Sequence, residues 1–199
     1  MKSPLLPFFS RFWRSRFAPL SSSTFFPLMK VAVEPAAAAA APADDGRHDF
    51  DFLSGQWHVV NRRLVKRLAG CTEWETFEAR QKAWPILSGL GNQDEFRAEG
   101  WRPGFIGMTL RFFNPATRQW SIYWVDNQRL VLDPPVVGAW EGGRGVFTTH
   151  DLFDGRPIVV RFTWTRPGVD AARWEQEFSP DDGATWEKNW VMDFTRTAG

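Results

Sequence analysis

From Trp57 onward the chain alternates short runs of aromatic and β-branched residues with turn residues, and no long stretch repeats its apolar positions with a helical period. The connections carry proline, glycine or other residues suited to turns. They are Asn114 to Thr117, Glu141 to Arg144, Asp154-Gly155, Arg166 to Gly168 and Asp181 to Gly183. Counting the runs between them gives roughly ten strands, as in an antiparallel meander that closes on itself. We therefore predict an all-β chain that forms a single antiparallel up-and-down β-barrel.

The alternation also predicts which side chains face the interior, because successive residues of a strand point to opposite faces. Four segments carry an apolar set on one face. Their predicted interior residues are Trp120, Ile122 and Trp124; Ile158, Val160, Phe162 and Trp164; Trp174, Gln176 and Phe178; and Trp190, Met192 and Phe194. The same rule puts Met108, Leu110 and Phe112 inside, and leaves Thr109 and Arg111 outside.

The first strand brings polar groups into the predicted interior. If Trp57 points inward, Val59, Asn61 and Arg63 do so as well. A buried amide and a buried guanidinium need hydrogen-bond partners, solvent or a bound molecule. Two interpretations stay open, namely a hydrated or ion-paired barrel mouth and a ligand site.

The composition is unusual in its aromatic content. The chain has twelve Trp and eighteen Phe but a single Tyr, and so much aromatic area in a small domain must fill a core or line a cavity. With 24 basic and 23 acidic residues, no general attraction to nucleic acid is expected. The lone Cys71 can form no internal disulfide, which fits a reducing compartment, and we expect a cytoplasmic protein.

The first part of the chain differs from the rest. We predict that residues 1–46 are an unfolded leader with an Ala- and Pro-rich linker, and that residues 47–197 are the barrel domain. The leader is basic and has no acidic residue before Glu34, which is typical of a targeting segment, but prolines interrupt its apolar runs, so no transmembrane segment is expected. The alternative is a true start at Met29, with misassigned sequence upstream.

Several segments resemble a known family. Gly55-Gln56-Trp57 has the Gly-x-Trp pattern that opens the first strand of lipocalins and related calycins, and it follows Asp49 to Leu53, which we expect to form a short helical turn that plugs the barrel floor. With residues 84–92, 114–120 and 190–196, this pattern resembles a bacterial family of lipocalin-like barrels classed as a domain of unknown function. The resemblance covers residues 47–196.

The resemblance implies one structural contact and no activity. In calycins a basic side chain near the last strand lies across the Gly-x-Trp indole, so Arg196 is expected over Trp57, and the cation–π contact would contribute about 0.5–2 kcal/mol. Gly55, Trp57 and Arg196 would then form a structural signature. Calycins bind lipids, pigments or haem, and a few are enzymes, so the resemblance leaves function open.

Other motifs add little chemistry. Ser179 to Trp186 matches the Asp-box of sialidases, Ser-x-Asp-x-Gly-x-Thr-Trp, but a propeller needs several copies, so we predict only a stable turn in which the Asp carboxylate caps turn amides. The three histidines are too scattered for a metal site, although a single axial His150 leaves haem open. No Gly-x-Ser-x-Gly elbow is present, so enzyme status is undecided.

We therefore hypothesise that the barrel binds a small, mostly apolar molecule among its inward aromatic side chains. The predicted ligand-binding residues are Asn61, Arg63, Trp124, Trp174, Gln176 and Trp190. One alternative is an enzyme of small-molecule metabolism that uses the same cavity, which a carboxylate with a shifted pKa would favour. A second is a filled barrel that acts through its surface, for example as a homodimer. The sequence does not identify a cofactor.

Overall fold

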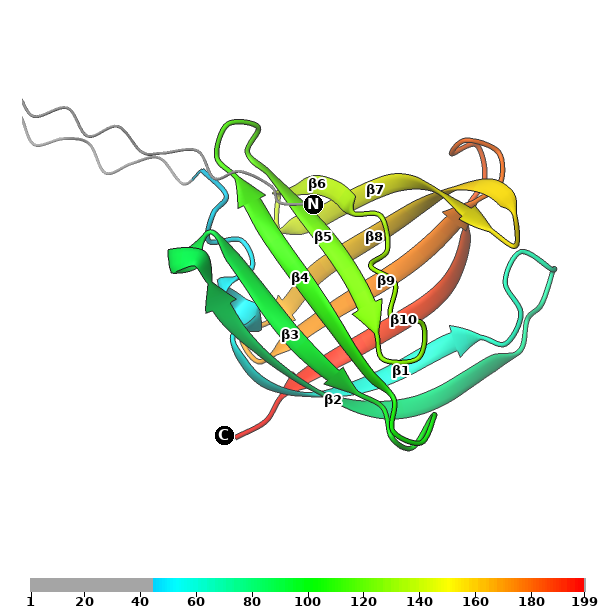
Figure 1. Ribbon diagram of the computed structural model, residues 1–199, viewed down its shortest axis with the longest axis horizontal. Helices are drawn as coiled ribbons and strands as arrows, with labels where there is room; N and C mark the ends of the chain where they lie inside the picture. The colour runs from blue at the N-terminus through cyan, green and yellow to red at the C-terminus, as the bar shows by residue number, and fades with distance from the viewer. Residues whose placement is uncertain (1–44, 199) are drawn as a thin grey trace, which may run out of the picture. The chain divides into compact units, whose positions relative to one another are not determined.

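The computed structural model describes residues 45–198, which form a closed barrel of ten antiparallel strands (Figure 1). The strands are β1 (Gly55–Leu64), β2 (Trp74–Ile86), β3 (Gly91–Arg97), β4 (Ile106–Asn114), β5 (Gln119–Asp126), β6 (Val136–Glu141), β7 (Arg144–Phe153), β8 (Arg156–Gly168), β9 (Ala171–Ser179) and β10 (Glu187–Arg196). Two 3₁₀ turns, η1 (Asp51–Leu53) and η2 (Leu87–Gly89), complete the elements. No helix within residues 45–198 has the length and apolar character needed to cross a bilayer. Residues 1–44 of the predicted leader and linker lie outside the described residues.

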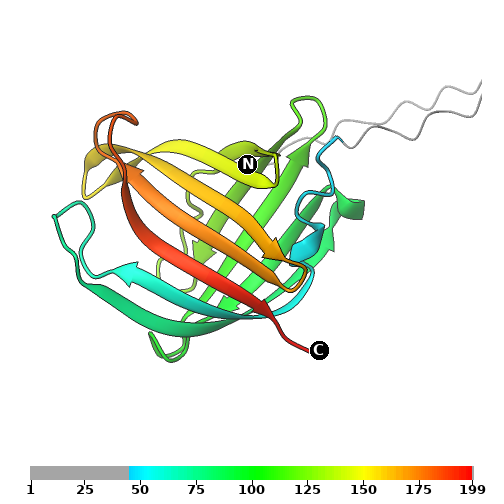
Figure 2. The same ribbon diagram turned by 180° about the vertical axis from the view of Figure 1, so that it is seen from behind.

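Each strand pairs with the next one along the chain, and β10 closes the barrel against β1. The view from behind shows β8, β9 and β10 followed by β1 (Figure 2). This confirms the prediction of an all-β, ten-stranded up-and-down barrel. Four of the five predicted connections fall between strands, but Arg166 to Gly168 ends β8, and the chain reverses at residues 169–170 after a register shift between Thr165 and Gly168.

One end of the barrel, here the plugged end, is closed by the residues before β1. Phe50 and Leu53 are almost fully buried there, and the Trp57 indole Nε1 donates a hydrogen bond to the Leu53 carbonyl oxygen at 2.8 Å. The Arg196 guanidinium carbon lies 4.3 Å from the centroid of the Trp57 ring, and its terminal nitrogens donate to the carbonyl oxygens of Phe52 and Ser54, each at 2.7 Å. This contact ties the last strand to the plug.

Gly55 is required where the plug meets β1. Its φ is +118°, in the region that favours glycine. A Cβ at this position would also lie 2.8 Å from a terminal nitrogen of Arg196. The glycine of the Gly-x-Trp pattern therefore gives the arginine room to reach the plug.

The opposite end, here the mouth, is bordered by the connections at residues 65–73, 98–105 and 127–135 and by the β7–β8 and β9–β10 hairpins. In the second hairpin the Asp181 carboxylate accepts hydrogen bonds from the Ser179 hydroxyl and from both the backbone N–H and the hydroxyl of Thr185. The hydrogen bond from the Thr185 hydroxyl is the main reason that the pKa of Asp181 lies below its usual value. The Asp-box segment is thus a turn, as predicted.

The alternation rule places the interior side chains correctly on β5, β8, β9 and β10 and fails on β4. There Thr109 and Arg111 are buried, and Met108, Leu110 and Phe112 lie on the outer face. Arg111 faces inward because β3 supplies partners for its guanidinium. The prediction for β4 is therefore wrong, and the correction places a charge in the barrel.

Candidate functional site: the barrel cavity

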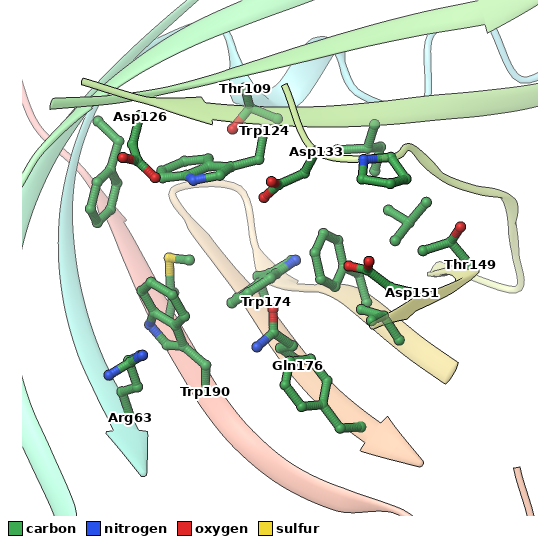
Figure 3. Close-up of a pocket in the computed structure, with 18 of the residues that line it drawn as sticks. Arg63, Thr109, Trp124, Asp126, Asp133, Thr149, Asp151, Trp174, Gln176 and Trp190 are labelled. Carbon is green, nitrogen blue, oxygen red and sulfur yellow. The ribbon is translucent and has the colours of Figure 1, made fainter. Parts of the chain in front are cut away.

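The half of the barrel nearer the mouth encloses a cavity of about 500 Å³ (Figure 3). This volume lies within the usual range for small-molecule sites. Its apolar lining includes Phe96, Ile122, Trp124, Val136, Ile158, Val160, Phe162, Trp174, Phe178, Trp190, Met192 and Phe194. The lining also includes the exposed side chains of Leu152 and Arg129. The cavity thus extends from the buried core to the surface at the mouth.

Aromatic rings form facing walls of the cavity. Trp174 and Trp190 pack edge to face, with ring centroids 5.8 Å apart, and Phe162 packs against Trp174 at 4.8 Å. Trp124 lies on the other side in the close-up (Figure 3). The rings are braced by one another, which favours a preformed site.

The position of Trp124 depends on Gly107. A Cβ at residue 107 would come within 2.1 Å of Trp124 Cη2, which no real contact allows. The two residues lie near each other on the inner faces of β4 and β5. The glycine therefore lets the indole lie close to the barrel wall and leaves the centre open.

Five of the six predicted ligand-binding residues line this cavity: Arg63, Trp124, Trp174, Gln176 and Trp190. Asn61 does not belong to the lining. It is fully buried behind the wall, and its Oδ1 accepts a hydrogen bond from Trp190 Nε1 at 3.0 Å. Asn61 thus contacts the cavity only through Trp190.

The two polar members of this set are held by neighbours. Arg63 donates to Glu75 Oε1 at 2.9 Å, and its guanidinium carbon lies 5.3 Å from the Trp190 ring centroid. Gln176 donates through Nε2 to Asn189 Oδ1 at 2.8 Å. Both side chains are therefore fixed in orientation by the protein, while Arg63 Nε has no hydrogen-bond partner among the described residues.

A buried ion pair lies deeper in the barrel. A terminal nitrogen of Arg111 donates to Asp94 Oδ2 at 2.6 Å and to Asn92 Oδ1 at 2.9 Å, and the Arg111 and Asp94 side chains are at most 3% exposed. Among the described residues, Arg111 Nε, Asp94 Oδ1 and Gln81 Nε2 have no partner. Arg111 and Gln81 line the cavity, so this end of the site is polar but its charge is neutralised within the protein.

The loops around the mouth bring in charged residues that sequence patterns missed. Arg129 pairs with Asp126 at 2.9 Å and with Asp133 at 2.8 Å. Burial would raise the pKa of Asp126, but hydrogen bonds from Arg129 and from the backbone N–H of Gln128 outweigh it, so the pKa lies below its usual value. Arg67, Trp101 and Arg102 enter the lining from two other connections. Since loops have no side-chain period, alternation gives no signal for them.

The histidines lie away from the cavity. His150 is on the outer face of β7 with its side chain 83% exposed, 3.3 Å from Asp182. It does not line the cavity, so it is not placed to ligate a haem there. Within residues 45–198, no group of three or more His, Cys, Asp or Glu side chains is arranged to hold a metal ion.

No family model matches this sequence, and no curated protein matches it. Among solved structures, the chain is similar to the S-type phycobiliprotein lyase CPES from Guillardia theta, with 11% sequence identity and a TM-score of 0.48. The match covers 78% of this chain and 96% of that chain. A likeness of this extent supports no conclusion about function.

Proposed function

We propose that this protein binds one small, largely apolar molecule inside its barrel. The observation that carries the proposal is the cavity of about 500 Å³ that runs from the aromatic core to the mouth. Protein interiors are close-packed and leave few voids larger than a water molecule. A space of this size with aromatic walls is therefore best explained as room for a ligand.

Named side chains have distinct roles in this proposal. The rings of Trp124, Trp174 and Trp190 bury the apolar body of the ligand, and planar ligand rings would stack or pack edge to face against them. Arg63 and Gln176, already oriented by Glu75 and Asn189, face a polar part of the ligand. Asn61 holds Trp190 in place from behind.

The two alternatives have less support. A filled barrel would have no cavity of this size. Catalysis would need a suitable acid or base in the lining, but hydrogen bonds from Arg129 and from the Gln128 backbone N–H outweigh burial and hold the pKa of Asp126 below its usual value. A general acid or base that works near neutral pH would instead need a raised pKa. The homodimer and the absence of a nucleic-acid partner stay predictions.

Titration with pyrenebutanol tests the proposal, because tryptophan emission overlaps pyrene absorption and energy transfer reports a ring bound near the indoles. We expect saturable quenching of tryptophan with one probe per chain. Val136 lines the cavity, and its neighbour Val137 points outward and is 36% exposed. The variants Val136→Trp and Val137→Trp therefore introduce the same ring inside and outside the barrel.

The proposal predicts that Val136→Trp weakens pyrenebutanol binding about tenfold or more by occupying the cavity, while Val137→Trp keeps the wild-type affinity. Equal affinity in the two variants would place the probe outside the barrel and contradict the proposal. Circular dichroism of both variants verifies that the barrel is folded.

A further inference from the structure

We propose that the molecule bound in the barrel is an acid, whose apolar body occupies the cavity and whose anionic group is held at the mouth by Arg67 and Arg102. The inference rests on the proposed function, because it names the chemical class of the same ligand and the direction in which it enters. A carboxylate is the simplest such group, since guanidinium forks bind it through two parallel hydrogen bonds.

Arg67 is the first of the two cations. It is half-buried in the connection between β1 and β2 and lines the cavity. Its guanidinium carbon lies 4.9 Å from the ring centroid of Phe153 and 5.6 Å from that of Phe178. Among the described residues, no carboxylate lies within ion-pairing distance of it. A charged group thus lies against aromatic rings with no carboxylate in direct contact.

The electrostatics of Arg67 agree with this geometry. Burial and the nearby charges of Arg63 and Arg102 lower its pKa to about 10, although Asp154 and Glu187 act in the opposite direction. The guanidinium stays protonated at neutral pH, but its surroundings disfavour the charge. An anion at this point would relieve both the desolvation and the repulsion between the cations.

Arg102 is the second cation. It comes from the β3–β4 connection, and its guanidinium carbon lies 4.0 Å from the Trp101 ring centroid. Its hydrogen bond to Gln128 Oε1 at 3.2 Å involves a neutral partner. In the described part of the chain it forms no ion pair. Arg102 is thus an exposed cation at the edge of the lining with no carboxylate in contact.

The acidic side chains of the cavity lining already have partners. Asp126 and Asp133 pair with Arg129, and Asp151 accepts a hydrogen bond from the Leu152 N–H. Two further acids next to the mouth are held as well, Glu75 by Arg63 and Trp101 and Glu187 by the Leu68 N–H. The acids of the lining are therefore engaged, while Asp154 and Glu187 act on Arg67 from beyond ion-pairing distance.

The deep end of the cavity is less suited to an anion. The charge of Arg111 is matched by Asp94 at 2.6 Å, so a second carboxylate there would face a pair with no net charge. It would also lose its hydration far from the mouth. The arrangement thus predicts an orientation, with the anionic group outward and the apolar body inward.

A pair of probes that differ only at the polar end tests the inference. Pyrenebutyric acid and pyrenebutanol share the ring and the chain, but the first is a carboxylate at neutral pH. We expect the wild-type protein to bind the acid about tenfold more tightly than the alcohol, as for a charge-assisted hydrogen bond. In the double variant Arg67→Gln with Arg102→Gln, the preference should disappear, so that the two probes bind with equal affinity.

The control variant is Arg80→Gln. Arg80 is exposed on β2, and it forms no ion pair with another described residue. It should keep the tenfold preference for the acid. The measured quantity is the ratio of the two affinities within one variant, so a loss of affinity for both probes does not imitate the expected result. Circular dichroism verifies that the double variant is folded.

The outcomes separate the two proposals. If both probes bind wild-type protein equally and Val136→Trp still weakens them, the cavity binds ligands and the inference of an acid is overturned. If the preference for the acid survives in the double variant, the anion lies elsewhere and the inference is also overturned. If neither probe binds, the proposed function fails together with the inference.

Discussion

Asn61 and Trp190 are joined by a hydrogen bond behind the cavity wall, in which the indole Nε1 donates to the amide Oδ1 at 3.0 Å. Asn61 is fully buried, and Trp190 faces the cavity. Asn61 thus orients the Trp190 ring, which lines the cavity, although Asn61 itself contacts neither the cavity nor solvent. The interior amide predicted from the first strand is part of the support for the site.

This relationship predicts the effect of Asn61→Leu. The change leaves the Trp190 N–H without its acceptor in a buried place, and we expect the free energy of unfolding to fall by about 1–3 kcal/mol. The looser indole should also weaken pyrenebutanol binding several-fold. Urea denaturation and the titration measure the two effects. Full affinity in a destabilised Asn61→Leu variant would show that the hydrogen bond does not shape the site.

Gly107 offers a test of cavity size. In Gly107→Ala the new methyl group collides with Trp124 and pushes the indole toward the centre of the cavity. Overpacking of this kind costs roughly 1–3 kcal/mol, so we expect pyrenebutanol to bind about fivefold or more weakly. The matched control is Gly100→Ala, because a Cβ at residue 100 meets no heavy atom within 4 Å. Equal affinities in the two variants would mean that Trp124 does not border the bound probe.

Sequence patterns predicted most of the barrel because the alternation that identifies a strand and its inward face lies within the strand itself. On β8 the residues Ile158, Val160, Phe162 and Trp164 form an apolar set two residues apart, and all four line the cavity. The ring of Trp57 under Arg196 likewise follows from a short motif and its position. Where the apolar residues of a strand all lie on its inward face, the two-residue alternation is enough to identify that face.

The same rule failed where burial depends on another strand. Arg111 is buried because Asp94 and Asn92 on β3 accept its hydrogen bonds. The sequence of β4 alone does not indicate that these partners exist. On the outer face, Phe112 packs against Tyr123 with ring centroids 5.9 Å apart, so an apolar set was no guide to the interior. The mouth cations were missed for a related reason, since loops carry no alternation.

The Arg111–Asp94 pair predicts a strong coupling between two substitutions. In Asp94→Leu the buried guanidinium loses its counter-ion, and we expect a loss of about 3–5 kcal/mol in the free energy of unfolding. Adding Arg111→Met removes the stranded charge, so the double variant should be more stable than Asp94→Leu alone. A double-mutant cycle by urea denaturation measures the coupling. Simple additivity would show that the two charges do not depend on each other.

Asp181 predicts a pH-dependent contribution to stability. Its pKa in the folded protein lies below its ordinary value of 3.8, so the ionised carboxylate stabilises the turn above that pH and the stabilisation is lost as the pH falls through the folded pKa. The melting temperature of Asp181→Ala should therefore lie below that of the wild type at neutral pH, and the difference should be smaller at the lowest pH at which the wild type stays folded. A difference that is the same at both pH values would contradict this role.

The central claim is that the interior of this barrel is a binding site, and a crystal structure of the protein grown with saturating pyrenebutanol tests it most directly. The account predicts density for the pyrene ring inside the barrel, in contact with Trp124, Trp174 and Trp190 and with its chain directed to the mouth. A probe bound only to the outer surface, over an interior that side chains have closed, would contradict it.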